Sequence, residues 1–92
     1  MIARHIVISG KVQGVFFRKN TKQKADNLDI SGWVKNADDD KVEIFAQGSE
    51  ENINSFINWC KHGPPKAEVK NIQVQEKKVN NTLNEFSIVY ED

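Results

Sequence analysis

The residues from Gly10 to Arg18 combine two glycines, an apolar pair and an arginine in a pattern that could bind an anion. The apolar run at residues 6–8 predicts a buried strand before them, and a helical pattern starts at Phe17. Backbone N–H groups can converge in a loop at the start of a helix and bind an anion, and an arginine in the first turn adds a bidentate positive charge. The segment would therefore be suited to bind one phosphate group.

The same loop also has an ordinary structural interpretation. Glycine-containing loops between a strand and a helix are common, and most of them bind nothing. An arginine in a first helical turn is usually solvated, where it slightly opposes the helix dipole. Physical chemistry alone leaves both interpretations of the segment from Gly10 to Arg18 open.

The composition predicts one small globular domain over residues 1–92. Hydrophobic residues make up 38% of the chain and charged residues 28%, as in ordinary soluble domains. Basic and acidic residues number 13 each, whereas a non-specific nucleic-acid binder would carry a basic excess. No apolar run approaches membrane-spanning length, and the first residues do not resemble a signal peptide. The single cysteine, Cys60, allows no internal disulfide, so we expect a cytoplasmic protein.

The rest of the chain predicts the elements that must hold the loop in place. Alternating apolar residues predict strands at residues 3–12, 30–36, 41–47, 67–77 and 86–90. Apolar residues at helical spacing predict helices at 17–28 and from an N-cap at Ser49 to about residue 62. The apolar alternation slips between Val69 and Ile72, which indicates a β-bulge near Asn71.

This order of elements predicts an α+β fold, namely a ferredoxin-like split βαβ sandwich with an antiparallel sheet and two helices on one face. The first strand would be central, with the loop from Gly10 to Arg18 at one end of the sheet. Asn36 would lie at the same end, because the first and second strands run parallel across a helix. The pattern leaves open where the last strand lies in the sheet.

Two segments of the chain resemble the acylphosphatase family. The run from Gly10 to Arg18 matches the signature G-x-V-Q-G-V-x-(F/Y)-R at every position. The second family segment, G-(F/Y/W)-V-x-N with a turn and a V-x-(I/V/A) strand, is similar to residues 32–36 and 42–44. Two motifs in register make the resemblance specific. Asn27 or Asp29 is expected to supply the left-handed residue that ends the first helix, and the family often has glycine at the position of Asp29. Asp40 also stands where the family has glycine, and if it keeps a positive φ, aspartate is less favourable there by roughly 1 kcal/mol.

The resemblance implies an enzyme that hydrolyses carboxyl phosphates (acyl phosphates) to a carboxylate and inorganic phosphate. Backbone N–H groups would bind the phosphoryl oxygens, and the Arg18 guanidinium would bind two of these oxygens. Asn36 would hold a water in line with phosphorus. The catalytic residues would be Arg18 and Asn36. The phosphate-binding residues would be Gln13, Gly14, Val15, Phe16, Phe17 and Arg18.

The implied reaction makes few further demands. A carboxylate is a good leaving group and needs no strong general acid, while Arg18 and the loop dipoles carry the charge, so we expect no cofactor and no metal. Inorganic phosphate, the product, would also be a competitive inhibitor. The expected partner is a small-molecule acyl phosphate, with no nucleic acid and no membrane, and we expect a monomer.

The other chemistry-bearing residues indicate structural roles. The acidic run at residues 38–40 lacks the glycine and distal glutamate of a calcium loop and predicts a turn. Cys60 lies on the apolar stripe of the second helix, which favours a core residue over a nucleophile. His5 has no acidic neighbour in sequence and His62 is typical of a helix end, so neither is assigned a catalytic role.

Two other functions stay open. A non-catalytic phosphate- or ligand-binding module of the same fold would need the loop and Arg18 but not Asn36. RNA binding through aromatic residues on the sheet is a more distant alternative, because the net charge is zero and both Phe17 and Trp33 fit the core or the family motif. The aromatic residues in question are Phe16, Phe17, Trp33, Trp59 and Tyr90.

Overall fold

The structure, a computed structural model, describes residues 1–90, and this part of the chain contains five strands and two helices. The strands are β1 (Ile2–Lys11), β2 (Ser31–Asn36), β3 (Val42–Gly48), β4 (Glu68–Lys77) and β5 (Phe86–Val89). The helices are α1 (Phe17–Asn27) and α2 (Glu50–Cys60). Every predicted element is present, with ends that differ from the prediction by two residues or fewer.

The strands form one sheet in the order β4-β1-β3-β2-β5. The pairs among β1, β2, β3 and β4 are antiparallel, and β1 lies inside the sheet between β4 and β3, in agreement with the predicted interior position. The last strand departs from the expected antiparallel arrangement, because β5 pairs in parallel with β2, from Gly32 opposite Phe86 to Lys35 opposite Val89. The α+β ferredoxin-like sandwich is confirmed, with a mixed rather than a purely antiparallel sheet.

A long loop after β4 brings β5 to the far edge of the sheet. Gln47, a buried residue of β3, anchors this loop: its Nε2 donates to the carbonyl of Asn80 at 2.9 Å, and its Oε1 accepts from the Asn80 N–H at 2.8 Å. The Gly32 N–H then donates to the carbonyl of Glu85 at 3.0 Å and starts the pairing of β5 beside β2.

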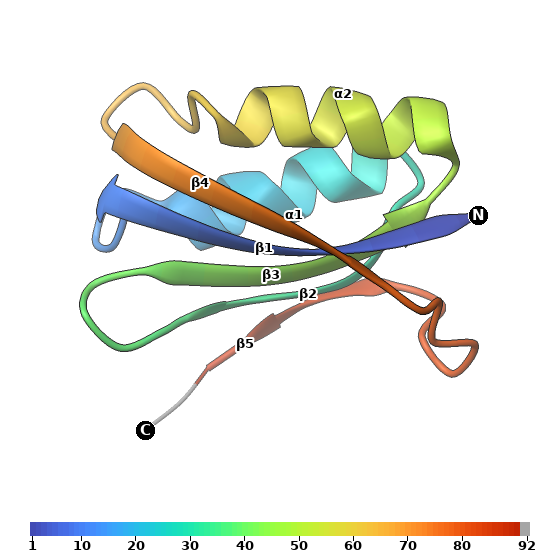
Figure 1. Cartoon of the computed structure of the whole chain (residues 1–92). Coiled ribbons are helices and arrows are strands. Elements are labelled where there is room, and N and C mark those ends of the chain that lie inside the picture. Colours follow the sequence, from blue (N-terminus) through green and yellow to red (C-terminus); the bar gives the residue numbers. More distant parts are fainter. Residues whose placement is uncertain (91–92) are drawn as a thin grey trace.

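Both helices cover the same face of the sheet, and the core lies between them and the strands (Figure 1). Ser49 caps α2 by accepting from the Asn52 N–H, and this helix buries one face. Cys60 lies on that face, where burial raises the pKa of its thiol, so the prediction of a core residue is confirmed. The buried residues of the two helices are Phe17, Thr21, Ala25, Ile53, Phe56 and Cys60.

Three irregularities of the backbone that the sequence indicated are present, with Asp29 rather than Asn27 as the left-handed residue after α1. Asp29 has φ 53° at the end of α1, and Asp40 has φ 61° in the hairpin between β2 and β3. Asp39, for which no such conformation was predicted, also has φ 61°. The pairing of β1 with β4 shifts register between Ser9 and Gly10, opposite residues 69–71, which is the predicted bulge.

The bulge explains why glycine stands at position 10, near the end of β1. Gly10 has φ 128°, and a Cβ at this position would lie 2.1 Å from the carbonyl oxygen of Glu68. Any other residue would clash with the β4 backbone, so glycine is required for the close approach of the two strands. The loop that leaves β1 and the turn between β2 and β3 lie at the same end of the sheet (Figure 1).

Candidate active site

Two residues of the loop between β1 and α1 adopt the left-handed backbone conformation before the helix begins. Gly14 has φ 74°, and Phe16, the N-cap residue, has φ 62° and ψ 25°. The buried side chain of Val15 anchors the loop to the core. Phe17 is also buried, and its ring lies 5.7 Å from that of Trp59. The loop is thus held on both sides of Phe16, whose ring is exposed.

The backbone N–H groups at the start of α1 are free to bind a ligand. No side chain caps this end of the helix, and within residues 1–90 no N–H from residues 14 to 19 donates to a protein acceptor. Unpartnered N–H groups in a first turn carry the positive end of the helix dipole. Anions such as phosphate bind at this kind of helix terminus.

Arg18 lies in the first turn of α1 and adds a full positive charge to these dipoles. Its guanidinium carbon lies 5.0 Å from the centroid of the Tyr90 ring. Such a cation–π contact orients the guanidinium without neutralising its charge. Within residues 1–90, no carboxylate forms an ion pair with Arg18. The charge is therefore available to an anionic ligand.

Asn36 is the last residue of β2 and lies in the same cleft as Arg18. Its side-chain oxygen Oδ1 is buried and has no hydrogen-bond partner among residues 1–90. A buried acceptor without a donor is rare, because leaving it unpaired costs about 1–3 kcal/mol. A donor from outside the protein, such as a water O–H, would satisfy it. Asn36 is therefore suited to hold a small polar molecule in the cleft.

Gln13 connects the loop to the hairpin that follows Asn36. Its Nε2 donates to the carbonyl of Ala37 at 3.0 Å and to the carbonyl of Lys41 at 2.8 Å. Ala37 directly follows Asn36 in the chain, so these two bonds fix the distance between the start of α1 and the end of β2. Because the Gln13 side-chain amide already donates to these two carbonyls, only the backbone N–H of Gln13 could contact phosphate.

The loop, Arg18 and Asn36 enclose a cleft of about 330 Å³. Four of the six predicted phosphate-binding residues line it, together with both predicted catalytic residues. Gln13 and Val15 do not line it, because their side chains are turned to the hairpin and the core. The lining residues are Val12, Gly14, Phe16, Phe17, Arg18, Lys19, Asn36, Ile88 and Tyr90.

Comparison with known proteins decides the family. The sequence model of the acylphosphatase family matches residues 4–88. The chain belongs to the acylphosphatase family. The acylphosphatase of Methylococcus capsulatus is 38% identical over 85 residues, which are 92% of each chain. The crystal structure of acylphosphatase from Bacillus subtilis superposes with a TM-score of 0.93 at 42% identity, over 98% of this chain and 100% of that one.

A second acylphosphatase structure, from Coxiella burnetii, gives a TM-score of 0.91 at 39% identity over 96% of this chain and 92% of that one. These similarities extend over nearly the whole of each protein, so they concern the complete acylphosphatase domain. The chain is thus an enzyme of this hydrolase family, as the two sequence motifs implied.

Several residues of the acylphosphatase cleft were not predicted from the sequence. Ile88 and Tyr90 reach it from β5 and the residue after it, and Lys19 lies beside Arg18. Alternation along residues 86–90 indicates that Phe86, Ile88 and Tyr90 share a face. Only the parallel pairing of β5 with β2 brings that face beside Asn36, and no local pattern encodes this pairing.

The remaining candidates lie outside the cleft. His5 Nε2 is 2.6 Å from Glu43 Oε2, and Lys35 Nζ is 3.7 Å from the other oxygen of that carboxylate, on the face of the sheet without helices. His62 is exposed, and its Nδ1 lies 3.2 Å from the carbonyl oxygen of Asn58. Among residues 1–90, no three His, Cys, Asp or Glu side chains are grouped as a metal site would require.

The aromatic residues considered for RNA binding do not share one surface. Trp33 lies outside the buried core, on the face without helices, where its ring stacks with Phe45 at 6.3 Å. Phe17 is buried on the opposite face, and Trp59 packs against it. No helix within residues 1–90 has the length and apolar character needed to cross a membrane.

Proposed function

We propose that this chain hydrolyses acyl phosphates in the cleft between α1 and β2, with a cradle of backbone N–H groups and Arg18 for the phosphoryl group and with Asn36 positioning the attacking water. The observation that carries this proposal is the pairing of Arg18 and Asn36 in one cleft, where Asn36 Oδ1 is buried without a protein partner. Phosphoryl transfer to water needs a positively charged site that binds the phosphoryl group and a polar side chain that can hold the water.

Binding of the phosphoryl group falls to the start of α1. The N–H groups of residues 14–19 have no protein acceptor among residues 1–90, so phosphate oxygens can accept from them without breaking a bond of the fold. Arg18 accommodates two oxygens at once through its planar fork. This charge stays in place as negative charge redistributes in the transition state, so the cradle stabilises the transition state as well as the substrate.

Asn36 holds the nucleophile. Its amide can accept from one water O–H through Oδ1 and still donate through Nδ2. The water oxygen forms a bond to phosphorus while the bond between phosphorus and the acyl oxygen breaks. The electron pair of that bond leaves with the carboxylate, and the water proton passes to the phosphate product or to solvent. The carboxylate is a weak base, so the reaction needs neither a histidine nor a covalent intermediate.

Gln13 holds the phosphate-binding loop and the end of β2, where Asn36 lies, in a fixed relative position. Its two hydrogen bonds to the carbonyls of Ala37 and Lys41 tie the phosphate loop to the residues beside Asn36. A displacement of about 1 Å between a nucleophile and its target can lower a rate by two orders of magnitude. We assign Gln13 this positioning role in addition to its backbone N–H.

The wider predictions for the protein follow from the same features. We infer one domain over residues 1–92, because α1, α2 and all five strands share one core. We infer a monomer, because the β4 edge carries Glu68, Lys70, Glu76 and Lys77, and charged side chains oppose pairing of edge strands. A buried free cysteine, Cys60, is compatible with a reducing cytoplasm.

Release of inorganic phosphate from a small aryl acyl phosphate tests the proposed function. The assay is run on purified protein without added metal, and phosphate binding is measured separately by competitive inhibition or calorimetry. We expect turnover and competitive inhibition by inorganic phosphate. Phosphate binding without any turnover would instead support the alternative of a non-catalytic binding module.

A further inference from the structure

The cleft has a polar part and an apolar part. The polar part comprises the N–H groups at the start of α1, Arg18 and Asn36. The apolar part comprises Phe16, Ile88 and Tyr90, together with the buried residues Val12 and Phe17. Phe16 is 68% exposed and Tyr90 is 71% exposed, so two aromatic residues border the cleft in contact with solvent.

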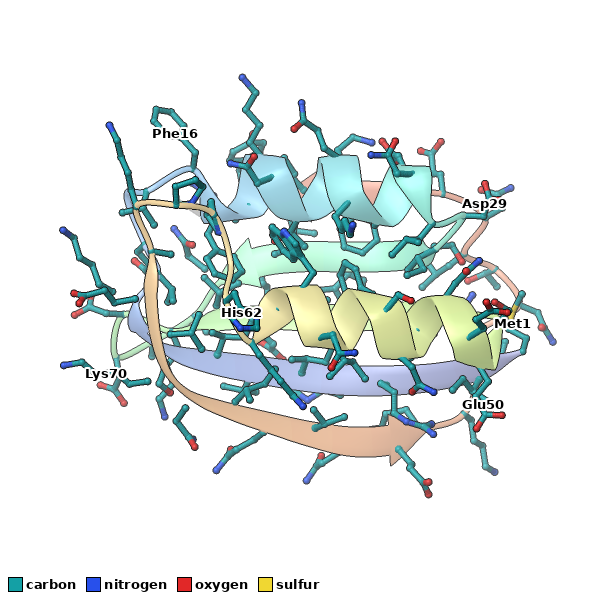
Figure 2. The ribbon with its side chains drawn as sticks, turned by 90° about the horizontal axis from the view of Figure 1, so that it is seen from above. Met1, Phe16, Asp29, Glu50, His62 and Lys70 are labelled. Atoms are coloured by element: carbon teal, nitrogen blue, oxygen red, sulfur yellow. The ribbon has the colours of Figure 1, made fainter. Side chains whose placement is uncertain are left out.

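Phe16 holds its ring there in an unfavourable backbone conformation. With φ 62° and ψ 25°, it is in the left-handed region, which bulky residues rarely occupy and which glycine or asparagine adopts more easily. The ring points away from the body of the protein at the start of α1 and contributes nothing to the core (Figure 2). The acylphosphatase signature leaves this position free. An exposed aromatic ring at a strained backbone position indicates a role outside the fold.

Tyr90 connects the apolar part to the phosphate site. Its ring lies 5.0 Å from the guanidinium carbon of Arg18, so one aromatic side chain contacts the cation proposed to bind phosphate and also borders the apolar part. A phosphoryl group on Arg18 and the loop would fill only a fraction of the 330 Å³ cleft. The acyl group attached to that phosphoryl group must therefore lie within reach of the surrounding side chains.

We infer that Phe16, with Ile88 and Tyr90, forms a subsite for the acyl group, and that the enzyme prefers acyl phosphates with an extended alkyl or aromatic acyl group over acetyl phosphate. This inference rests on the proposed function, because the phosphoryl group must occupy the cradle for the acyl group to reach the subsite. Burial of a full methylene increases affinity about fourfold. In an open cleft that covers about half of each group, we expect about twofold per methylene.

Alkyl- and arylphosphonates, whose carbon–phosphorus bond the enzyme cannot hydrolyse, test the subsite separately from the chemistry. The competitive inhibition constants of methyl-, butyl-, hexyl- and phenylphosphonate are measured against acetyl phosphate for four proteins. In the wild type we expect butylphosphonate to bind about eightfold more tightly than methylphosphonate. Phe16→Asn removes the ring but suits the left-handed backbone, and we expect less than a twofold difference there. Phe16→Leu should keep most of the dependence on chain length.

Val74→Asn is the matched control, because Val74 is an apolar residue with 42% exposure on the edge strand β4, outside the cleft. It should show the same dependence on chain length as the wild type. An equal affinity of the wild type for all four phosphonates, or a Phe16→Asn protein with the wild-type dependence, would overturn the inference. Phosphate release from acetyl phosphate by the wild type separates the two proposals. If the wild type releases phosphate but shows no dependence on chain length, only the subsite is wrong; if it releases no phosphate, the proposed function fails as well.

Discussion

Replacement of Arg18 by glutamine removes the full positive charge proposed to bind phosphate while retaining a shorter, neutral polar side chain. Arg18 is partly buried at the start of α1, stacks on Tyr90, and has no ion pair among residues 1–90. Its removal therefore leaves no unpaired carboxylate within that part of the chain. The substitution therefore weakens binding of the phosphoryl group, because one bidentate, charge-assisted contact in a partly desolvated cleft contributes about 2–4 kcal/mol.

This free energy corresponds to a decrease in kcat/KM of about 30- to 800-fold. We expect the inhibition constant of inorganic phosphate to rise as well, because Arg18 contacts both substrate and product. Initial rates of phosphate release give kcat/KM, and circular dichroism verifies that the fold is intact. The two measurements together separate a lost contact from a lost structure.

Lys19→Gln provides the matched control, since Lys19 is the next residue of α1, also lines the cleft, and loses the same charge. Exposed lysines interact weakly with ligands, at about 0.2–1 kcal/mol, so we expect kcat/KM to fall less than about fivefold. An equal loss in both variants would mean that the cleft attracts phosphate by general charge and not by a directed contact. An Arg18→Gln protein with the wild-type rate would refute the assignment of Arg18.

Three further changes have expected outcomes. Asp40→Gly should raise the free energy of unfolding by roughly 0.5–1 kcal/mol and leave activity near wild type, because glycine relieves the φ of 61°; destabilisation in urea would show that the Asp40 side chain caps the turn. Gln13→Ala should lower stability by about 1–2 kcal/mol through the loss of two hydrogen bonds, and should reduce kcat more than phosphate affinity; unchanged kcat would contradict its positioning role. Activity should survive dialysis against a chelator, and a loss restored by magnesium would show that Arg18 and the loop do not suffice.

The parts of the site that could be predicted are those encoded by local sequence. The segment from Gly10 to Arg18 contains its own strand end, turn glycines and helix start, so its path from strand to loop to helix could be predicted locally. The left-handed residues Asp29 and Asp40 follow similarly from the end of a helix and a tight hairpin. Asn36 could be placed at the correct end of the sheet because a helical crossover returns the chain in the same direction.

The parts that could not be predicted depend on pairings between distant segments. Alternation in residues 86–90 indicates a strand with two faces, but it contains no information on the neighbouring strand or its direction, so the contact of Tyr90 with Arg18 was not foreseen. The hydrogen bonds from Gln13 to the hairpin also join residues at least 24 positions apart. Trp33 is a strand residue in a family motif, and only the completed sheet shows that it faces away from the helices.

Replacement of Asn36 by alanine tests most directly whether the cleft is a catalytic site with a positioned water. Asn36 brings no charge to the phosphate, so Asn36→Ala should keep the inhibition constant of inorganic phosphate within a few-fold of wild type. The same variant should lower kcat by roughly two orders of magnitude or more, the usual loss when a reacting group is no longer held in place. Hydrolysis of an acyl phosphate by Asn36→Ala at the wild-type rate would contradict the role of Asn36, and a parallel loss of phosphate binding would make it part of the anion site.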